Sequence, residues 1–140
     1  GAKVVSVGTT STRSLESLYY AGLQCYSEGV DNWTPRCVGQ WDPYSGNPEI
    51  STKESIKCLL EYMDRNSLNV LNLRTQIIIV PSYRFKVVDM LVTNFHQPQS
   101  TLLLLISAFV GEEKWKDIYG YALDNGFRFL SYGDSSLLVR

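Results

Sequence analysis

Histidine, cysteine and an excess of charge of either sign are all scarce in this sequence of 140 residues. Thirteen basic residues stand against 14 acidic ones, which gives a net charge of −1. Nucleic-acid-binding domains usually carry a clear basic excess that neutralises phosphates, so charge alone does not identify one here. The three cysteines, Cys25, Cys37 and Cys58, include no CxxC pair. This pattern argues against a disulfide framework or a metal site, and favours reduced thiols of a cytosolic protein.

Long apolar runs are also absent. The longest one, residues 102–106 followed by 108–110, is too short to cross a bilayer, and no signal peptide is visible. Hydrophobic residues still make up 44% of the chain, which is enough for the core of one ordinary domain. Because a strand-like segment begins almost at once, we expect the chain to be a piece of a longer protein.

The sequence alternates between strand-like and helix-like segments. The predicted strands are 3–7, 73–80, 85–92 and one or two within 127–132 and 135–139. Four helices are predicted. The first begins near Thr10–Thr12, the third covers Thr101–Phe109 and the fourth lies around Trp115–Leu123. The second begins after Ser51, which forms a capping box with Glu54, and its apolar stripe consists of Ile56, Leu59, Leu60 and Met63. Residues 26–50 are predicted to form a long ordered loop. This alternation predicts a layered α/β sheet.

The stretch "VGTTSTR", residues 7–13, places a glycine and several hydroxyls at a strand-to-helix junction. The N–H groups and dipole of a helix start favour an anion such as phosphate or carboxylate, and Arg13 is able to add a bidentate contact. The glycine spacing of a P-loop is missing. Simple capping by Thr9, Thr10 and Ser11, with Arg13 on a solvated face, explains the pattern equally well.

The stretch "LVTNFHQPQSTLLLL" holds the single histidine of the chain. Asn94, Phe95 and His96 follow a predicted strand, in the zone where open α/β sheets place ligands. His96 is suited to proton transfer near neutral pH, and Asn94 to holding a substrate amide or carbonyl. Ser100 or Thr101 is expected to cap the next helix. In the alternative interpretation, Asn94 stabilises a turn and His96 bonds to the backbone.

Two carboxylates lie near these segments. Asp89 follows apolar residues, and a carboxylate in such a place needs a partner. Strand alternation puts Lys86 on the opposite face, so Asp89 is either an ion-pair or capping residue with a partner elsewhere or a site residue. Asp134 follows Gly133 at a strand break, where it is either part of a solvated turn or a contact for a ribose hydroxyl.

Three segments, "VGTTSTRSLES", "YRFKVVDMLVTNFHQPQSTLLLLISAFVG" and "FRFLSYGD", closely resemble signature segments of the S-adenosylmethionine:tRNA ribosyltransferase-isomerase family of the queuosine pathway. They occur in the family's usual order. The resemblance implies the C-terminal part of a larger two-domain cytoplasmic protein. It implies that residues 1–140 form a single domain, a layered α/β/α sandwich with a mixed sheet, without the family's inserted β-barrel domain.

The resemblance also implies a reaction. The ribosyl group of S-adenosylmethionine is moved to 7-aminomethyl-7-deazaguanine in tRNA and rearranged, which gives epoxyqueuosine and releases adenine and methionine. S-adenosylmethionine is then a substrate, with no further cofactor and no metal, and tRNA is the partner. On this resemblance His96 transfers a proton or hydrogen-bonds to the departing adenine or the ribose, and Asp89 and Asp134 are second choices as acid, base or ribose contact. The substrate-binding residues on this reading are Thr9, Thr10, Ser11, Arg13, Lys86, Asn94, Phe95, Ser100, Thr101 and Tyr132.

The sequence departs from the family pattern at a few positions. Gln97 stands where the family usually has Leu, and Ser82 stands where the family motif "PGY" has Gly. Serine adopts a positive φ less readily than glycine does. "DSS" replaces a more apolar "DAM", and the loop at 26–50 matches no family motif. Two alternatives therefore stay open: a divergent paralogue with another base substrate, and a nucleotide- or RNA-binding module without catalysis. A phosphate-ester hydrolase ranks last. The chain alone is expected to be inactive.

Overall fold

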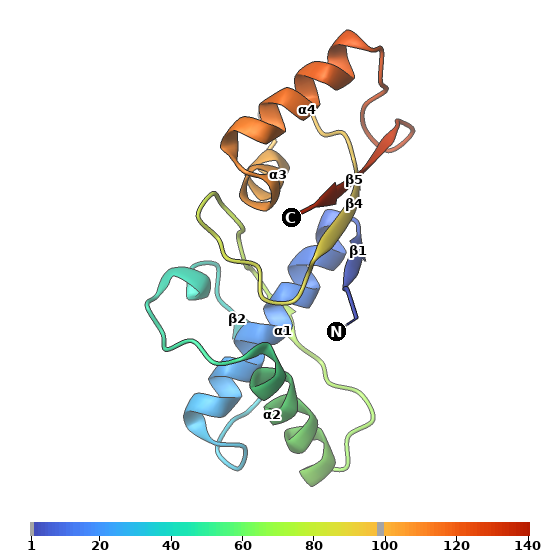
Figure 1. Ribbon diagram of the computed structural model, residues 1–140. Helices are drawn as coiled ribbons and strands as arrows, with labels where there is room; N and C mark the ends of the chain where they lie inside the picture. The colour runs from blue at the N-terminus through green and yellow to red at the C-terminus, as the bar shows by residue number, and fades with distance from the viewer. Residues whose placement is uncertain (1, 98–99) are drawn as a thin grey trace. The chain divides into compact units, whose positions relative to one another are not determined.

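The computed structural model describes residues 2–97 and 100–140, which form two compact units. The first unit is Gly1–Arg13 with Ile79–Arg140, and the second is Ser14–Ile78. The elements, most of them labelled in Figure 1, are β1 (Val5–Val7), α1 (Thr9–Glu28), β2 (Cys37–Val38), the 3-10 helix η1 (Asp42–Tyr44), α2 (Thr52–Arg65), β3 (Arg74–Thr75), β4 (Met90–Asn94), α3 (Leu102–Val110), α4 (Glu112–Asp124) and β5 (Ser135–Val139). The mixed α/β class predicted from the sequence is confirmed.

The first unit is built on a three-stranded sheet with β4 in the centre, as Figure 1 shows. β4 pairs in parallel with β1 and antiparallel with β5, so that Val92 lies between Val7 and Leu137. The sheet is therefore mixed, as expected. Side chains of alternate residues point to opposite faces, and Leu91 and Leu138 on one face are buried.

The two helices after β4 are where the sequence predicts them. α3 ends at Gly111, whose φ is 99°, and α4 is followed by Gly126, whose φ is 68°. Glycine adopts such a positive φ without the steric cost of a Cβ atom, which is why it so often follows a helix. α3 packs against α4 and β5 and thereby links the helices to the sheet.

The strand predicted at 85–92 is wrong in its first half, since β4 begins only at Met90. Of the preceding residues, Phe85 and Val88 are buried although neither belongs to a strand. The Phe85 ring packs edge-to-face on Phe109 at 4.8 Å, and Val88 is fully buried. The apolar pattern of this segment reflects burial by aromatic packing and not a strand.

Two further segments differ in part from the predicted strands. Of the one or two strands predicted within 127–132 and 135–139, the structure has one, β5. Residues 127–132 form no strand, because Leu130 has a φ of 70° and the Gly133 N–H donates to its carbonyl at 3.0 Å. The segment 73–80 is a strand only at Arg74–Thr75, which pairs in parallel with β2. The Gln76 and Ile78 N–H groups after β3 still donate to the carbonyls of Val38 and Gln40. The predicted extended course is therefore correct, although only two residues of the segment form a regular strand.

The second unit depends on a close crossing of α1 and α2. A Cβ atom at Gly22 would lie 2.1 Å from Ser55 Oγ, and the Ser55 hydroxyl donates to the Tyr19 carbonyl at 2.7 Å. The capping box of α2 is confirmed. Its predicted apolar stripe is wrong at Leu60, which is 56% exposed, because the crossing turns Ser55 and Leu59 inward instead.

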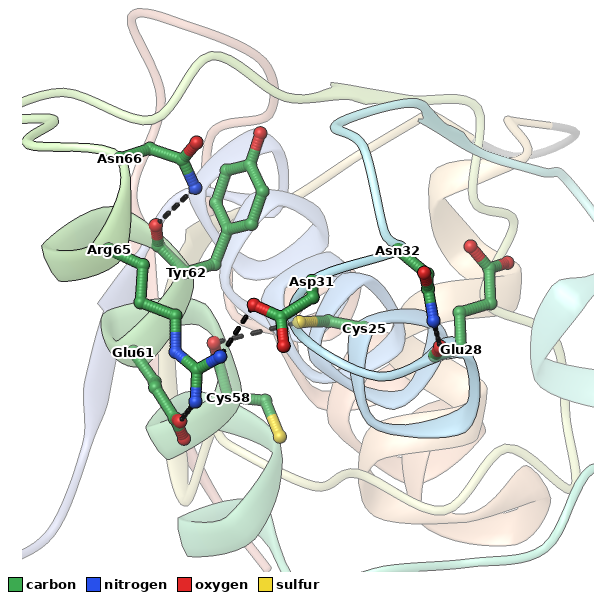
Figure 2. Close-up of polar contacts among 9 residues, drawn as sticks. All are labelled: Cys25, Glu28, Asp31, Asn32, Cys58, Glu61, Tyr62, Arg65 and Asn66. Carbon is green, nitrogen blue, oxygen red and sulfur yellow. Dashed lines mark hydrogen bonds and ion pairs between the residues drawn. The ribbon is translucent and has the colours of Figure 1, made fainter.

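Polar contacts join the ends of the same two helices (Figure 2). The Arg65 guanidinium lies 2.5 Å from both Asp31 and Glu61. The Cys25 thiol donates to the Cys58 carbonyl at 3.6 Å, and all three cysteines of the chain are free thiols. Burial, with a smaller contribution from Cys58, raises the pKa of Cys25 to about 11, so this thiol stays protonated at neutral pH.

A tight turn in the first unit contains Ser82, a serine at positive φ. The Tyr83 N–H donates to the Val80 carbonyl at 3.0 Å, and Ser82 has a φ of 82°. Pro81 followed by a positive φ is the pattern of a type II turn, whose third position favours glycine. Ser82 is thus held in a conformation that costs an L-residue about 1 kcal/mol.

We expect Ser82→Gly to raise the free energy of unfolding by about 1 kcal/mol, because it removes this strain. Urea unfolding followed by circular dichroism measures the change. Ser131→Gly is the matched control, since Ser131 is not among the residues of positive φ, and there the added chain entropy lowers stability. Equal effects at both positions would contradict the explanation.

We expect Gly22→Ala to lower the free energy of unfolding by about 2 kcal/mol or more, because its Cβ would overlap Ser55. Gly120→Ala in α4 is the matched control. No atom lies within 4 Å of a Cβ there, so the higher helix propensity of alanine raises stability by up to about 1 kcal/mol. Thermal unfolding of both variants tests the prediction, and a Gly22→Ala variant as stable as the parent would refute it.

Candidate functional site

A hollow of about 390 Å³ lies at the carboxyl ends of β1 and β4 in the first unit. The residues that line it are Val7, Gly8, Thr9, Thr10, Ser11, Val92, Thr93, Asn94, His96 and Ser135. Five of the predicted site residues, Thr9, Thr10, Ser11, Asn94 and His96, therefore come together here. Open α/β sheets bind ligands at this end of their strands. We call this hollow the His96 pocket.

The start of α1 forms one wall of the His96 pocket. Gly8 has a φ of 89°, and its N–H donates to the Val92 carbonyl at 2.8 Å, which ties the turn to β4. The Thr12 hydroxyl donates to the Gly8 carbonyl at 3.0 Å and fixes the first turn. The first N–H groups of any helix lack intrahelical partners, and no acidic residue occupies this turn. The wall therefore presents donors and the positive end of the helix dipole.

The backbone on both sides of the Phe95–His96 peptide bond is held from outside β4. The His96 N–H donates to the Tyr119 hydroxyl at 3.0 Å, and the Phe95 carbonyl accepts from the Leu130 N–H at 2.9 Å. The Phe95 ring lies 5.4 Å from the Tyr119 ring and 5.6 Å from the Phe127 ring, both edge-to-face. These contacts fix where the imidazole of His96 leaves the backbone.

The imidazole itself is half-buried, and His96 Nε2 lies 3.1 Å from Thr93 Oγ1. The Thr93 hydroxyl also lies in donor geometry to the Asn94 carbonyl at 3.4 Å. We infer that Thr93 donates to this carbonyl and accepts from Nε2–H, which leaves Nδ1 as a proton acceptor. Burial lowers the pKa of His96 below its ordinary value of 6.5, so the ring is neutral at physiological pH.

Ser135, the first residue of β5, lines the pocket beside Asn94. The Ser135 hydroxyl donates to Asn94 Oδ1 at 2.9 Å. This bond orients the carboxamide and leaves its NH₂ group as the donor for a ligand.

Asp89 lies at the opposite end of β4, before its first residue. Its carboxylate accepts from the Val4 N–H at 2.9 Å and from Lys3 Nζ at 3.4 Å. The Val4 N–H, and after it the charge of Lys3, lower the pKa of Asp89. The carboxylate thus fastens the start of β1 to the start of β4 and lies away from the His96 pocket.

Asp134 closes the loop before β5. Its carboxylate accepts from the Arg128 N–H at 2.7 Å, and its own N–H donates to the Arg128 carbonyl at 2.9 Å. The first of these bonds lowers the pKa of Asp134. Tyr132, at the tip of the same loop, is 97% exposed. Neither residue lines the His96 pocket.

The other predicted substrate-binding residues also lie outside the His96 pocket. Arg13 and Lys86 are half-buried, on α1 and before β4, and Phe95 is buried in the aromatic cluster. The Ser100 hydroxyl accepts from the Leu102 N–H at 3.2 Å, whereas Thr101, the N-cap residue of α3, makes no capping bond with its side chain. Ser100 and Thr101 line a second hollow of about 470 Å³ together with Pro81, Leu103, Leu104, Ser107, Glu112, Trp115 and Lys116.

Three residues of the site were missed in the sequence. Thr93 lies next to Asn94, which was predicted as a site residue, and its hydroxyl could have marked it as a site residue too. Tyr119 lies on the predicted apolar face of α4, where its phenol is a polar group among mostly apolar side chains. Ser135 carries no local signal, because its place depends on the pairing of β5 with β4.

Within residues 2–97 and 100–140, no helix combines the length and the apolar character needed to cross a membrane. The histidine, cysteine, aspartate and glutamate side chains of that same part gather in no group of three or more that is suited to a metal ion.

We expect the lowered pKa of His96 to make stability depend on pH. Between this lowered pKa and 6.5 the unfolded chain binds more protons than the folded one, so stability falls as the pH drops through that window and is fully present above it. The difference in unfolding free energy between pH 7.5 and pH 5 should shrink in His96→Gln. Urea denaturation of both proteins measures it, and an unchanged difference would exclude the histidine as the cause.

Comparison with known proteins gives the site a family context. The sequence model of the family described as "Queuosine biosynthesis protein" matches residues 1–138. The S-adenosylmethionine:tRNA ribosyltransferase-isomerase of Acidiphilium cryptum is 56% identical over all 140 residues, which correspond to 28% of its own length. That of Agrobacterium fabrum is 61% identical over 66 residues, or 47% of this chain and 18% of its own.

A solved structure supports the same relationship. The crystal structure of an S-adenosylmethionine tRNA ribosyltransferase from Thermotoga maritima aligns with 99% of this chain and 34% of its own, at a TM-score of 0.60 and 27% identity. The chain thus spans about a third or less of the length of these relatives. Because the family match extends over nearly every residue, the chain belongs to the queuosine biosynthesis protein family.

Proposed function

We propose that this chain carries part of the active site of an S-adenosylmethionine:tRNA ribosyltransferase-isomerase. The observation that carries the proposal is the composition of the His96 pocket. Its lining comes from the "VGTTSTR" and "MLVTNFH" segments, which are two of the segments that resemble the family, and they meet at the ligand-binding end of the sheet. Relatives that align with all or nearly all of this chain are named for this activity.

His96 is the group we propose for proton transfer. Removal of a proton beside the sulfonium of S-adenosylmethionine requires a base that is unprotonated at neutral pH. The lowered pKa of His96 and the inferred free Nδ1 meet that requirement. Thr93 and Tyr119 position the ring and its backbone without touching the substrate.

We propose that the start of α1 binds an anion. The methionine carboxylate of S-adenosylmethionine and a tRNA phosphate are both candidates for its free N–H groups and for the hydroxyls of Thr10 and Ser11. The Asn94 NH₂ group, oriented by Ser135, is a donor for a ribose or base oxygen. In this scheme S-adenosylmethionine is a substrate consumed in a cytoplasmic reaction on tRNA.

The competing candidate is a module that binds a nucleotide or RNA without catalysis. It is favoured because none of the described residues that line the pocket carries a carboxylate to serve as a second acid or base. The two candidates make different predictions for adenine release.

We expect His96→Gln in the full-length protein to lower the rate of adenine release from S-adenosylmethionine by about 10²–10⁴-fold, the usual contribution of a general base. Liquid chromatography of the released adenine, in the presence of precursor tRNA, measures the rate. Tyr121→Phe on the exposed side of α4 serves as the control and should keep the parent rate.

Three outcomes separate the candidates. A large loss in His96→Gln alone supports proton transfer by the histidine. Unchanged release in that variant removes His96 from the mechanism. Absence of adenine release in the parent, with retained tRNA binding, would favour the binding module.

A further inference from the structure

The loop that joins α4 to β5 (Figure 1) holds most of the third segment that resembles the family, "FRFLSYGD". The residues that line the His96 pocket come from the other two segments and from Ser135, so this segment has no part in the pocket. Tyr132, at the tip of the loop, is 97% exposed. An aromatic ring that stays almost wholly in water buries no apolar surface, so it does not stabilise this chain by burial.

Backbone contacts close the loop tightly beneath Tyr132. The Gly133 N–H donates to the Leu130 carbonyl at 3.0 Å, and the Asp134 N–H donates to the Arg128 carbonyl at 2.9 Å. The Asp134 carboxylate accepts from the Arg128 N–H at 2.7 Å. A Cβ atom at Gly133 would lie 2.4 Å from the Arg128 carbonyl oxygen, so the loop has no room for a side chain there. The tyrosine is therefore presented on a defined turn.

Leu130 in this turn has a backbone conformation that L-residues avoid. Its φ of 70° lies in the left-handed region, where the Cβ atom approaches the following carbonyl oxygen. Strain of this kind persists only where surrounding contacts hold it, and it is concentrated at sites that bind ligands. A loop that only connected α4 to β5 would not need it. The strain and the exposed ring together indicate that the turn serves to present Tyr132.

Both sides of the turn are fixed to the His96 pocket. The Leu130 N–H donates to the carbonyl of Phe95, the residue before His96, at 2.9 Å. Ser135, three residues after Tyr132, lines the pocket itself. Three residues span at most about 11 Å, so the backbone at Tyr132 lies close to the rim of the pocket. A chain molecule with one unit in the pocket is therefore able to place the neighbouring unit on the ring.

We propose that Tyr132 stacks on an unpaired RNA base, adjacent to the base that is modified at the His96 pocket. Proteins recognise single-stranded RNA by stacking its unpaired bases on aromatic side chains, and one exposed ring is enough for one base. The inference rests on the proposed function for the presence of RNA. It adds a contact and a binding mode that neither the family match nor the pocket supplies.

The surroundings of Tyr132 fit RNA better than a protein partner. A stable protein interface buries about 800 Å² on each side, whereas the direct neighbours of the tyrosine are Ser131 and Gly133, which offer little apolar surface. The Arg128 side chain at the base of the loop is 74% exposed, and its guanidinium lies 3.5 Å from the Asp134 carboxylate. Such an exposed ion pair is weak, so the guanidinium is available to a phosphate.

The test removes the ring in the full-length protein and measures the affinity for precursor tRNA by fluorescence anisotropy at a fixed salt concentration. We expect Tyr132→Ala to weaken binding by about 5- to 150-fold, the usual effect of losing one stacked base. Tyr132→Phe should bind as the parent does, because stacking uses the ring and not the hydroxyl. Tyr26→Ala, which removes a tyrosine that is 52% exposed on α1, is the control and should also bind as the parent does.

A second measurement establishes whether the ring is free in the full-length protein before RNA binds. Tyr132→Cys should react with N-ethylmaleimide at nearly the rate of the same protein unfolded in urea, as followed at its own peptide by mass spectrometry. Strong protection in the absence of RNA would overturn the proposal in favour of a contact with another part of the polypeptide.

The binding results separate this inference from the proposed function. Unchanged affinity in Tyr132→Ala overturns the inference, and so does an equal loss in Tyr132→Phe or in Tyr26→Ala. A parent protein that does not bind tRNA overturns both the inference and the proposed function. A loss confined to Tyr132→Ala upholds the inference, even where unchanged adenine release in His96→Gln removes the histidine from the mechanism.

Discussion

The position of β4 between two partners is the constraint on which the rest of the first unit depends. Its hydrogen bonds to β1 place the start of α1 beside its carboxyl end, and those to β5 place Ser135 beside Asn94. Asp89 reinforces this pairing at the other end by holding Val4. If β4 shifted by one residue, every side chain would change faces and the polar groups of the pocket would be separated.

Contacts outside the sheet decide the orientation of the groups at its edge. His96 follows the last residue of β4, so no ladder hydrogen bond fixes it. A phenol from α4 and a backbone N–H from the loop before β5 hold the peptide on either side instead. Phe95 and Tyr119, which contribute to these bonds, are buried, and a hydrogen bond is electrostatically stronger in such surroundings than in water. Burial also keeps the imidazole neutral, so one set of contacts determines both its position and its protonation.

The same three strands present a polar pocket and an apolar face, on which Val5, Val7, Leu137 and Val139 are exposed. Family relatives three to four times longer than this chain contain the matching sequence as one part. The second unit depends on a different constraint. Its helices cross so tightly at Gly22 that only a residue without a Cβ atom fits there.

The sequence by itself determined the α/β class, the capping box of α2, the helices α3 and α4 with their glycine ends, and five residues of the pocket. Each of these rests on local chemistry, such as helix periodicity, a capping hydroxyl or glycine at positive φ. Strand extents were predicted poorly, because ring packing of Phe85 buries apolar residues as strand pairing would. Only the tertiary structure decided that Asp89 and Asp134 fasten the backbone, and that Tyr119 and Ser135 belong to the site. These placements depend on pairing between segments far apart in the chain, on which local sequence carries no information.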